Sequence, residues 1–163
     1  MSEISKIKLS IIIPAHNEAE VIEKTLSGLE AAVTTPHEII VVQDHCTDAT
    51  PDIVGNFSTT NSNVRLISNA DIKGFGNAIQ IGFCVARCET VAIVMADLCD
   101  DPATIDEMYK KLVESNSDLV CASRYMHGGK KISGPYIQGA LSSLVSRSMR
   151  VMIGIPTWDI ANS

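Results

Sequence analysis

Four polar segments carry the residues of this chain that could do chemistry, and each directly follows a short apolar run. They are residues 14–18, 43–48, 97–102 and 123–131. The first three contain carboxylates, whereas the last is basic and contains two adjacent glycines. Polar segments of both charges after apolar runs indicate a site for a charged ligand.

The third segment, Asp97-Leu98-Cys99-Asp100-Asp101-Pro102, places three carboxylates within five residues. Carboxylates this close repel one another unless a cation lies among them. A divalent cation, Mg²⁺ or Mn²⁺, with diphosphate oxygens completing its ligands, is the economical explanation, and it would offset charge on a leaving diphosphate. The alternative is a solvated acidic turn in which Asp101 caps the next helix.

The first two segments could bind a ligand or cap helices. Asn17 or Glu18 could cap the helix that follows or hydrogen-bond a ligand, and for a single such residue the cap is the simpler reading. Asp44 could accept a hydrogen bond from a nucleobase N–H or a ribose hydroxyl. Thr47 or Asp48 is expected to cap the next helix.

The remaining signals are basic or rich in glycine. Arg124 could grip a phosphate through two hydrogen bonds, whereas a solvated loop is as good a reading for Lys130 and Lys131. The turn Gly74-Phe75-Gly76-Asn77-Ala78 resembles a dinucleotide-binding pattern only in part, and it follows the third strand, not the first. We interpret it as a close-approach turn near phosphate or sugar, with Lys73 beside it.

Alternating apolar runs predict the elements that position these segments. Strands are expected at 9–14, 38–43, 64–68, 90–95 and 119–123, and helices at 19–33, 49–57, 75–87, 102–114 and 136–153. This order predicts an α/β fold, an open and mostly parallel sheet with helices on both faces. Ligands of such sheets bind outside the carboxyl ends of the strands, where the polar segments fall.

Composition narrows the function further. The 163 residues fit one domain, and the net charge of −6 argues against a nucleic-acid partner. The five cysteines show no metal-ligand spacing, and free buried thiols in a reducing cytoplasm are expected. The four histidines are expected to be surface or capping residues, although His16 and His45 lie near the predicted site. The chain shows neither a signal peptide nor a run of ~20 apolar residues, which predicts a cytoplasmic location.

Together, these segments resemble the family 2 glycosyltransferases of the GT-A fold, and in particular the dolichyl- or polyprenyl-phosphate sugar transferases. The resemblance covers nearly the whole chain in the right order. It rests on Pro14-Ala15-His16-Asn17-Glu18, Val42 to Thr50, Gly74 with Gly76 and Ala78, Met95 to Pro102, and Ala122-Ser123-Arg124-Tyr125. Gln43 and Met95 stand where the family pattern has aspartate.

The resemblance implies a role for each segment. Asp97 would be the metal-binding carboxylate, with Asp100 and Asp101 as further candidates, and Arg124 would hold the acceptor phosphate or the donor diphosphate. Asp97 and Arg124 are therefore the expected catalytic residues. The nucleotide-sugar pocket is expected to comprise Pro14, Ala15, Asn17, Glu18, Asp44, Lys73 and Gly74.

The implied reaction is inverting transfer of a sugar from a UDP- or GDP-sugar to a polyprenyl (dolichyl) phosphate. Two alternatives stay open: a saccharide or protein acceptor, and a decayed domain that only binds nucleotide sugars. Residues 1–163 are expected to be a single glycosyltransferase domain truncated at its acceptor side. Absent C-terminal segments could then attach it to the cytoplasmic face of a membrane.

Overall fold

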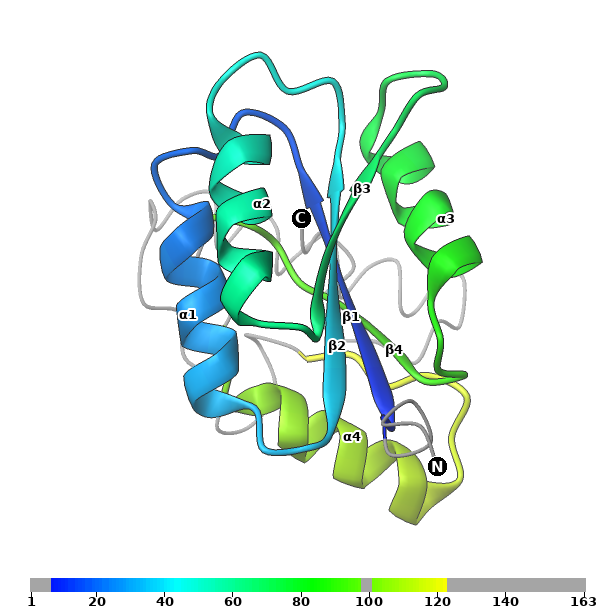
Figure 1. The fold of residues 1–163 in the computed structure, drawn as a ribbon. Helices are drawn as coiled ribbons and strands as arrows, with labels where there is room; N and C mark the ends of the chain where they lie inside the picture. Colours follow the sequence, from blue (N-terminus) through cyan, green and yellow to red (C-terminus); the bar gives the residue numbers. More distant parts are fainter. Residues whose placement is uncertain (1–6, 98–100, 123–163) are drawn as a thin grey trace, which may run out of the picture. The chain divides into compact units, whose positions relative to one another are not determined.

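The computed structural model of this chain describes residues 7–97 and 101–122 (Figure 1). The chain divides into two compact units, residues 1–107 and 108–163. The helix expected at 136–153 lies outside the described residues, as do Asp100 and Arg124. The site is therefore built below from the first unit.

The strands of the first unit form one parallel sheet in the order β3-β2-β1-β4. They are β1 (Leu9–Ala15), β2 (His37–Gln43), β3 (Val64–Ser68) and β4 (Val91–Ile93). The register of β1 and β2 runs from Leu9 opposite His37 to Ala15 opposite Gln43. Isoleucine and valine dominate both central strands because these strands are covered on both faces, as parallel strands normally are.

Helices cover both faces of this sheet. In Figure 1, α1 (Ile22–Ala32) and α2 (Thr50–Thr60) lie on one side of the sheet and α3 (Phe75–Val85) on the other. A fourth helix, α4 (Thr104–Ser115), spans the division between the two units. Helices on both faces of a parallel sheet confirm the predicted α/β class. No helix of the described residues is long and apolar enough to span a bilayer.

Several expected boundaries differ from those of the structure, among them the start of α1 and both ends of β4. α1 begins at Ile22, not at residue 19, and the amide of Ala19 before it donates to the Asp48 carboxylate. Neither Asn17 nor Glu18 caps this helix, whose N-cap is Val21. β4 is shorter than expected, although the amide of Val94 still donates to the carbonyl of Ile12 at 3.0 Å.

The fifth strand expected at 119–123 is not formed by its described residues, 119–122. Leu119 is 76% exposed and Cys121 is exposed, so this apolar run gains no buried face to hold it extended. The four cysteines within the described residues are free, as expected, but none of them is buried: Cys46 and Cys88 are half-buried, and Cys84 and Cys121 are exposed.

Packing of α3 on the sheet leaves no room for a side chain at Gly82. A Cβ atom there would lie 2.5 Å from Cγ2 of Ile12, a fully buried residue of β1. We expect Gly82→Ala to lower the free energy of unfolding by about 1–3 kcal/mol, since the helix or the isoleucine must shift. Urea unfolding monitored by circular dichroism measures this loss.

Gly55 in α2 is the matched control because a Cβ atom there meets nothing within 4 Å. Gly55→Ala should raise the free energy of unfolding by about 0.5–1 kcal/mol, the usual gain from glycine to alanine inside a helix. Equal effects of the two substitutions would contradict the close approach of α3 to the sheet.

Candidate functional site

The predicted nucleotide-binding residues gather at the carboxyl ends of β1, β2 and β3. Pro14 and Ala15 are buried and end β1, where they pair with Val42 and Gln43 of β2. The backbone continues this pairing past the strands, since the amide of Asp44 donates to the carbonyl of Ala15 at 2.8 Å. The loops that follow these strands are therefore held side by side.

The loops after β1 and β2 are joined by side chains. Asn17 has a positive φ of 59°, a conformation asparagine tolerates, and its Oδ1 accepts from the amide of Thr47 at 2.8 Å. Asp48 accepts from the amide of Ala19 at 3.0 Å and from the amide of Thr50 at 3.0 Å. The Thr50 hydroxyl in turn accepts from the amide of Glu18 at 2.8 Å.

These contacts show that several of the predicted residues have a structural role. The expected cap of α2 by Thr47 or Asp48 is wrong, because the N-cap is Ala49; Asp48 instead accepts from the amide of Thr50 and holds the neighbouring loop. Hydrogen bonds from these donors lower the pKa of Asp48, the Thr50 hydroxyl most of all. Asn17 joins loops where helix capping was the simpler reading, so its contribution to a pocket would be to shape it.

Asp44 lies at the centre of the site. The residue is 5% exposed, and its carboxylate accepts from Nδ2 of Asn69 at 2.7 Å and from the amide of Gly74 at 2.9 Å. One residue thus ties the loop after β2 to the loop after β3. Each carboxylate oxygen retains a second lone pair, so both hydrogen bonds are compatible with a further donor from a ligand.

Gly74 takes a conformation that side chains avoid. Its φ is +153° with ψ 143°, and it forms the N-cap of α3. The amide bound to Asp44 fixes this conformation, and the carbonyl of Gly74 accepts from Ala78 in the first turn of the helix. Glycine at this position therefore brings the helix start against Asp44, as the interpretation of a close-approach turn predicts.

Two histidines attach the loop after β3 to the other loops. Nδ1 of His16 lies 2.6 Å from the carbonyl oxygen of Asp44, and its Nε2 lies 3.0 Å from Nζ of Lys73. Nε2 of His45 lies 3.0 Å from the carbonyl oxygen of Asp71. Both rings are exposed, as expected of surface residues, but each bridges two loops of the site.

Three carboxylates of the site, those of Glu18, Asp48 and Asp97, lie close enough to affect one another. Burial raises the pKa of Glu18, and the neighbouring carboxylates of Asp97 and Asp48 raise it further, against a smaller opposing effect of His16. Asp97 is exposed just beyond β4. Repulsion among these carboxylates is the condition that a bound cation would relieve.

Comparison with known proteins decides the family. The glycosyl transferase family 2 domain matches residues 10–154. The chain belongs to glycosyl transferase family 2. It is 31% identical over 136 residues to the dolichol-phosphate mannosyltransferase of Pyrococcus furiosus. The alignment covers 83% of this chain and 38% of that protein.

Two further relatives agree with the family. The undecaprenyl-phosphate mannosyltransferase of Micrococcus luteus is 30% identical over 151 residues, covering 91% of this chain and 61% of that protein. Among solved structures, the mannosyltransferase PcManGT of Pyrobaculum calidifontis, in complex with GDP-Man and Mn²⁺, superposes with a TM-score of 0.58 at 28% identity. The match covers 64% of this chain and 32% of that one. The fold is that of the GT-A glycosyltransferases, and the chain spans less than two thirds of the length of each of these relatives.

The divalent cation expected from the sequence would need oxygen ligands, and the described residues supply some of them. Asp101 is exposed, but its Oδ1 accepts from the amide of Ala103 at 3.0 Å, the capping contact expected from the sequence. Asp97 offers oxygen of the kind that Mg²⁺ and Mn²⁺ prefer. Across residues 7–97 and 101–122 no group of three or more His, Cys, Asp or Glu side chains is arranged to hold a metal. Asp97 therefore fits a metal whose other ligands come from the nucleotide or from outside these residues.

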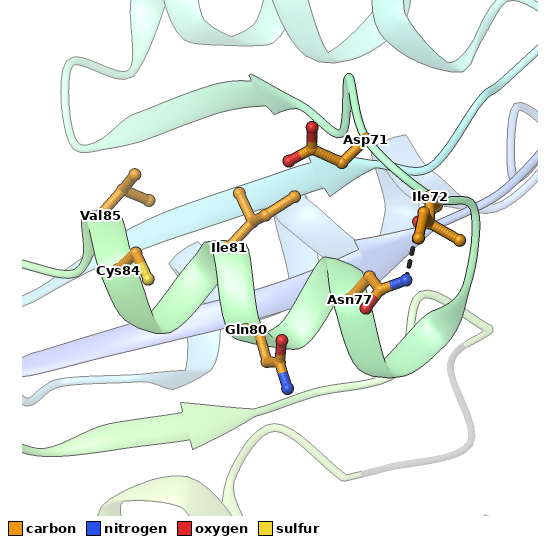
Figure 2. A pocket seen from close by; sticks show the side chains of 7 residues that line it. All are labelled: Asp71, Ile72, Asn77, Gln80, Ile81, Cys84 and Val85. Carbon is orange, nitrogen blue, oxygen red and sulfur yellow. Dashed lines mark hydrogen bonds between the residues drawn. The ribbon is translucent and has the colours of Figure 1, made fainter.

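A pocket of about 270 Å³ lies beside the site, on α3 (Figure 2). Three of its side chains are aliphatic, and Nδ2 of Asn77 donates to the carbonyl of Ile72 at its rim, at 2.8 Å. None of the predicted site residues lines it. The lining residues are Asp71, Ile72, Asn77, Gln80, Ile81, Cys84 and Val85.

Sequence reasoning missed Asn69, and it placed His16 near the site without assigning it a contact. Asn69 is 3% exposed and holds both the Asp44 carboxylate and the carbonyl of Ile72. His16 links Asp44 to Lys73. The available signal was position alone, since each polar residue directly follows a strand and ligands of open parallel sheets bind at the strand ends.

Proposed function

We propose that this chain carries the donor site of an inverting glycosyltransferase that moves a sugar from a UDP- or GDP-sugar to a polyprenyl phosphate. The convergence of three loops on Asp44 is the observation that carries the proposal. The carboxylate of Asp44 is buried, fixed by two hydrogen bonds and placed at the carboxyl ends of the strands. A fixed carboxylate there suits the N–H groups of a nucleobase or a ribose hydroxyl.

The other predicted pocket residues have supporting parts in this proposal. Pro14 and Ala15, whose carbonyl accepts from the amide of Asp44, and Asn17 and Glu18 in the loop that follows are proposed to contact the nucleotide. Lys73 and Gly74 bring a positive charge and a helix start toward the phosphates. The mannosyltransferase PcManGT forms a complex with GDP-Man, which supports a nucleotide-sugar donor.

Mg²⁺ or Mn²⁺ is the proposed cofactor, with Asp97 as a ligand and Asp100 and Asp101 as further candidates. When bound, the ion would offset negative charge on the leaving nucleoside diphosphate. The PcManGT complex also contains Mn²⁺, which supports this choice. In this chain, the negative charges of Asp97 and Asp48 lie near Glu18, which supports the choice of a cation.

The proposed acceptor is a polyprenyl phosphate such as dolichyl phosphate. A phosphate oxygen of the acceptor attacks the anomeric carbon, and the bond from that carbon to the donor diphosphate breaks with inversion. Because the acceptor oxygen is already anionic, no general base has to remove a proton. Arg124 is proposed to hold this phosphate, and the similarity to two lipid-phosphate mannosyltransferases supports such an acceptor. Membrane association at the cytoplasmic face is part of the same proposal.

Titration calorimetry with UDP, GDP and NAD, each with and without Mn²⁺, tests the donor site. We expect UDP or GDP to bind and Mn²⁺ to strengthen that binding by roughly tenfold or more, which is ~1.4 kcal/mol or more. Nucleotide binding that ignores the metal would favour the decayed binding domain, with Met95 as the suspected cause. Binding of NAD alone would refute the donor site.

The acceptor is tested in a separate transfer assay. We expect the sugar to be transferred to a short-chain polyprenyl phosphate and not to the corresponding polyprenol. Transfer to a saccharide or a peptide in place of the lipid phosphate would refute the acceptor and leave the donor site standing.

A further inference from the structure

Positive charge is scarce at the edge of the sheet where the donor would bind. The described residues of the four loops at this edge are 14–21, 43–49, 68–74 and 94–97. They contain six Asp and Glu residues and a single Lys or Arg, which is Lys73. Lys73 is therefore the cationic side chain that these loops can offer to a diphosphate bound at this edge.

The contact that holds Lys73 leaves its charge intact. Within the described residues, Nζ of Lys73 is hydrogen-bonded to Nε2 of His16 at 3.0 Å, and none of the ion pairs there involves this lysine. A carboxylate partner would have neutralised the ammonium, whereas an imidazole acceptor orients it without neutralising it. A lysine held in this way remains available to an anion.

The second contact of His16 fixes which nitrogen accepts. Nδ1 of His16 lies 2.6 Å from the carbonyl oxygen of Asp44. A carbonyl can only accept, so Nδ1 carries the proton, and Nε2 of the neutral ring then has the lone pair that accepts from Lys73. His16 thus joins the backbone of the central residue of the site to the ammonium of Lys73.

The position of the ammonium relative to the site follows from its own loop. Lys73 directly precedes Gly74, whose amide is bound to the Asp44 carboxylate at 2.9 Å. The loop between β3 and α3 is held further by Asn69, which bonds both Asp44 and the carbonyl of Ile72. The backbone under Lys73 is therefore fixed against Asp44, and His16 fixes the end of its side chain.

We propose that His16 is a positioning residue that holds the Lys73 ammonium, with its charge intact, for the diphosphate of the nucleotide donor. The proposal rests on the donor site proposed above and adds to it a role for His16. In this proposal, the affinity for the diphosphate of the donor depends on two coupled side chains, His16 in the loop after β1 and Lys73 in the loop after β3.

Calorimetry on the whole chain with Mn²⁺ tests the pair, comparing the diphosphate that binds, UDP or GDP, with its parent nucleoside. We expect Lys73→Met to weaken diphosphate binding roughly 10- to 100-fold, the range for a hydrogen bond to a charged group, and to spare nucleoside binding. His16→Asn keeps a donor within reach of the Asp44 carbonyl and removes the Nε2 acceptor. It should also weaken diphosphate binding and spare the nucleoside.

The double variant decides whether His16 acts through Lys73. In the Lys73→Met background, His16→Asn should have no further effect, since the partner it positions is gone. Lys8→Met, which removes the same charge just before the opposite end of β1, should bind the diphosphate like the unsubstituted chain. A full additional loss in the double variant, or a His16→Asn chain that binds the diphosphate normally, would overturn the proposal.

Ring ¹⁵N chemical shifts of His16 in the ligand-free chain separate this proposal from the donor site on which it rests. We expect a protonated Nδ1 and an unprotonated Nε2. The opposite tautomer together with normal diphosphate binding would refute the positioning role and leave the donor site intact. The expected tautomer without any diphosphate binding would refute the donor site, and with it the ligand assigned to this pair.

Discussion

Replacing Glu38 with glutamine is expected to lower the free energy of unfolding at neutral pH by about 2–3 kcal/mol. Glu38 is fully buried in β2, and its carboxylate accepts from the Ser10 hydroxyl at 2.8 Å and the Arg87 amide at 2.7 Å. Nη1 of Arg65 lies 2.9 Å from the other oxygen. Glutamine would turn an NH₂ group toward one of these donors, and that donor would then have no acceptor.

The size of this loss follows from the exposure of the partners. Removing one member of a fully buried ion pair costs about 3–5 kcal/mol. The side chains of Arg65 and Arg87 are 25% and 40% exposed, so water can solvate them after the substitution. The expected loss is therefore at or below the lower end of that range.

The pH dependence of stability supplies a second readout for Glu38. Burial alone raises the pKa of this carboxyl, but hydrogen bonds from the Arg87 amide, the Ser10 hydroxyl and Arg65 outweigh burial and hold the pKa below its ordinary value of 4.5. A carboxyl whose pKa is lower in the folded chain than in the unfolded one stabilises the fold above the unfolded pKa. This stabilisation is lost as the pH falls through the folded pKa.

Urea unfolding at a series of pH values measures both effects. The difference between the unsubstituted chain and Glu38→Gln should be largest near neutral pH and shrink below pH 4.5. Glu89→Gln changes the same charge at an exposed position and should stay within about 0.5 kcal/mol at neutral pH. A difference that stays constant down to strongly acidic pH would show that the Glu38 carboxylate contributes no charge-dependent stability.

The elements that the sequence predicted well are those whose own residues decide them. The strand Val64–Ser68 and the start of α3 at Phe75 agree with expectation because a β-branched run and a glycine turn are local signals. The contact that holds the segment before α1 was missed, since it joins the amide of Ala19 to Asp48, 29 residues away in the sequence. No local pattern reports a contact of that kind.

In the site, too, local features could be predicted from the sequence and contacts between distant residues could not. The position of Asp44 at the end of β2 follows from the strand pattern, and the structure places it among the other predicted residues of the first three loops. Its two protein partners, and the contact between His16 and Lys73 across 57 residues, depend on how the loops fold against each other. The buried network of Glu38 was missed because a glutamate at the start of an apolar run reads as a strand boundary.

Replacing Asp97 with asparagine is expected to remove most of the effect of Mn²⁺ on donor binding. Asp97 is exposed just beyond β4, and asparagine would offer the ion one neutral oxygen in place of a charged carboxylate. We expect affinity for UDP or GDP in the presence of Mn²⁺ to fall roughly tenfold or more, and metal-free affinity to change little. Calorimetry with and without Mn²⁺ measures the two affinities.

The pKa of Glu18 reports the charge of Asp97 in the absence of both metal and nucleotide. Burial is the main reason that the pKa of Glu18 is raised, and the Asp97 carboxylate is the second. Asp97→Asn should therefore lower the pKa of Glu18 toward its ordinary value, which NMR titration of the Glu18 carboxyl measures. Glu89→Gln, which removes a charge from the loop before β4, should leave this pKa unchanged.

The two readouts together locate the metal. A lower Glu18 pKa and a lost Mn²⁺ effect would place the ion at Asp97, next to the carboxylates whose repulsion it relieves. A lower Glu18 pKa with the Mn²⁺ effect intact would show that Asp97 lies where the structure puts it but is not a ligand. The ion would then have to be held by Asp100, by Asp101 or by the diphosphate, and the role that family resemblance assigns to Asp97 would be wrong.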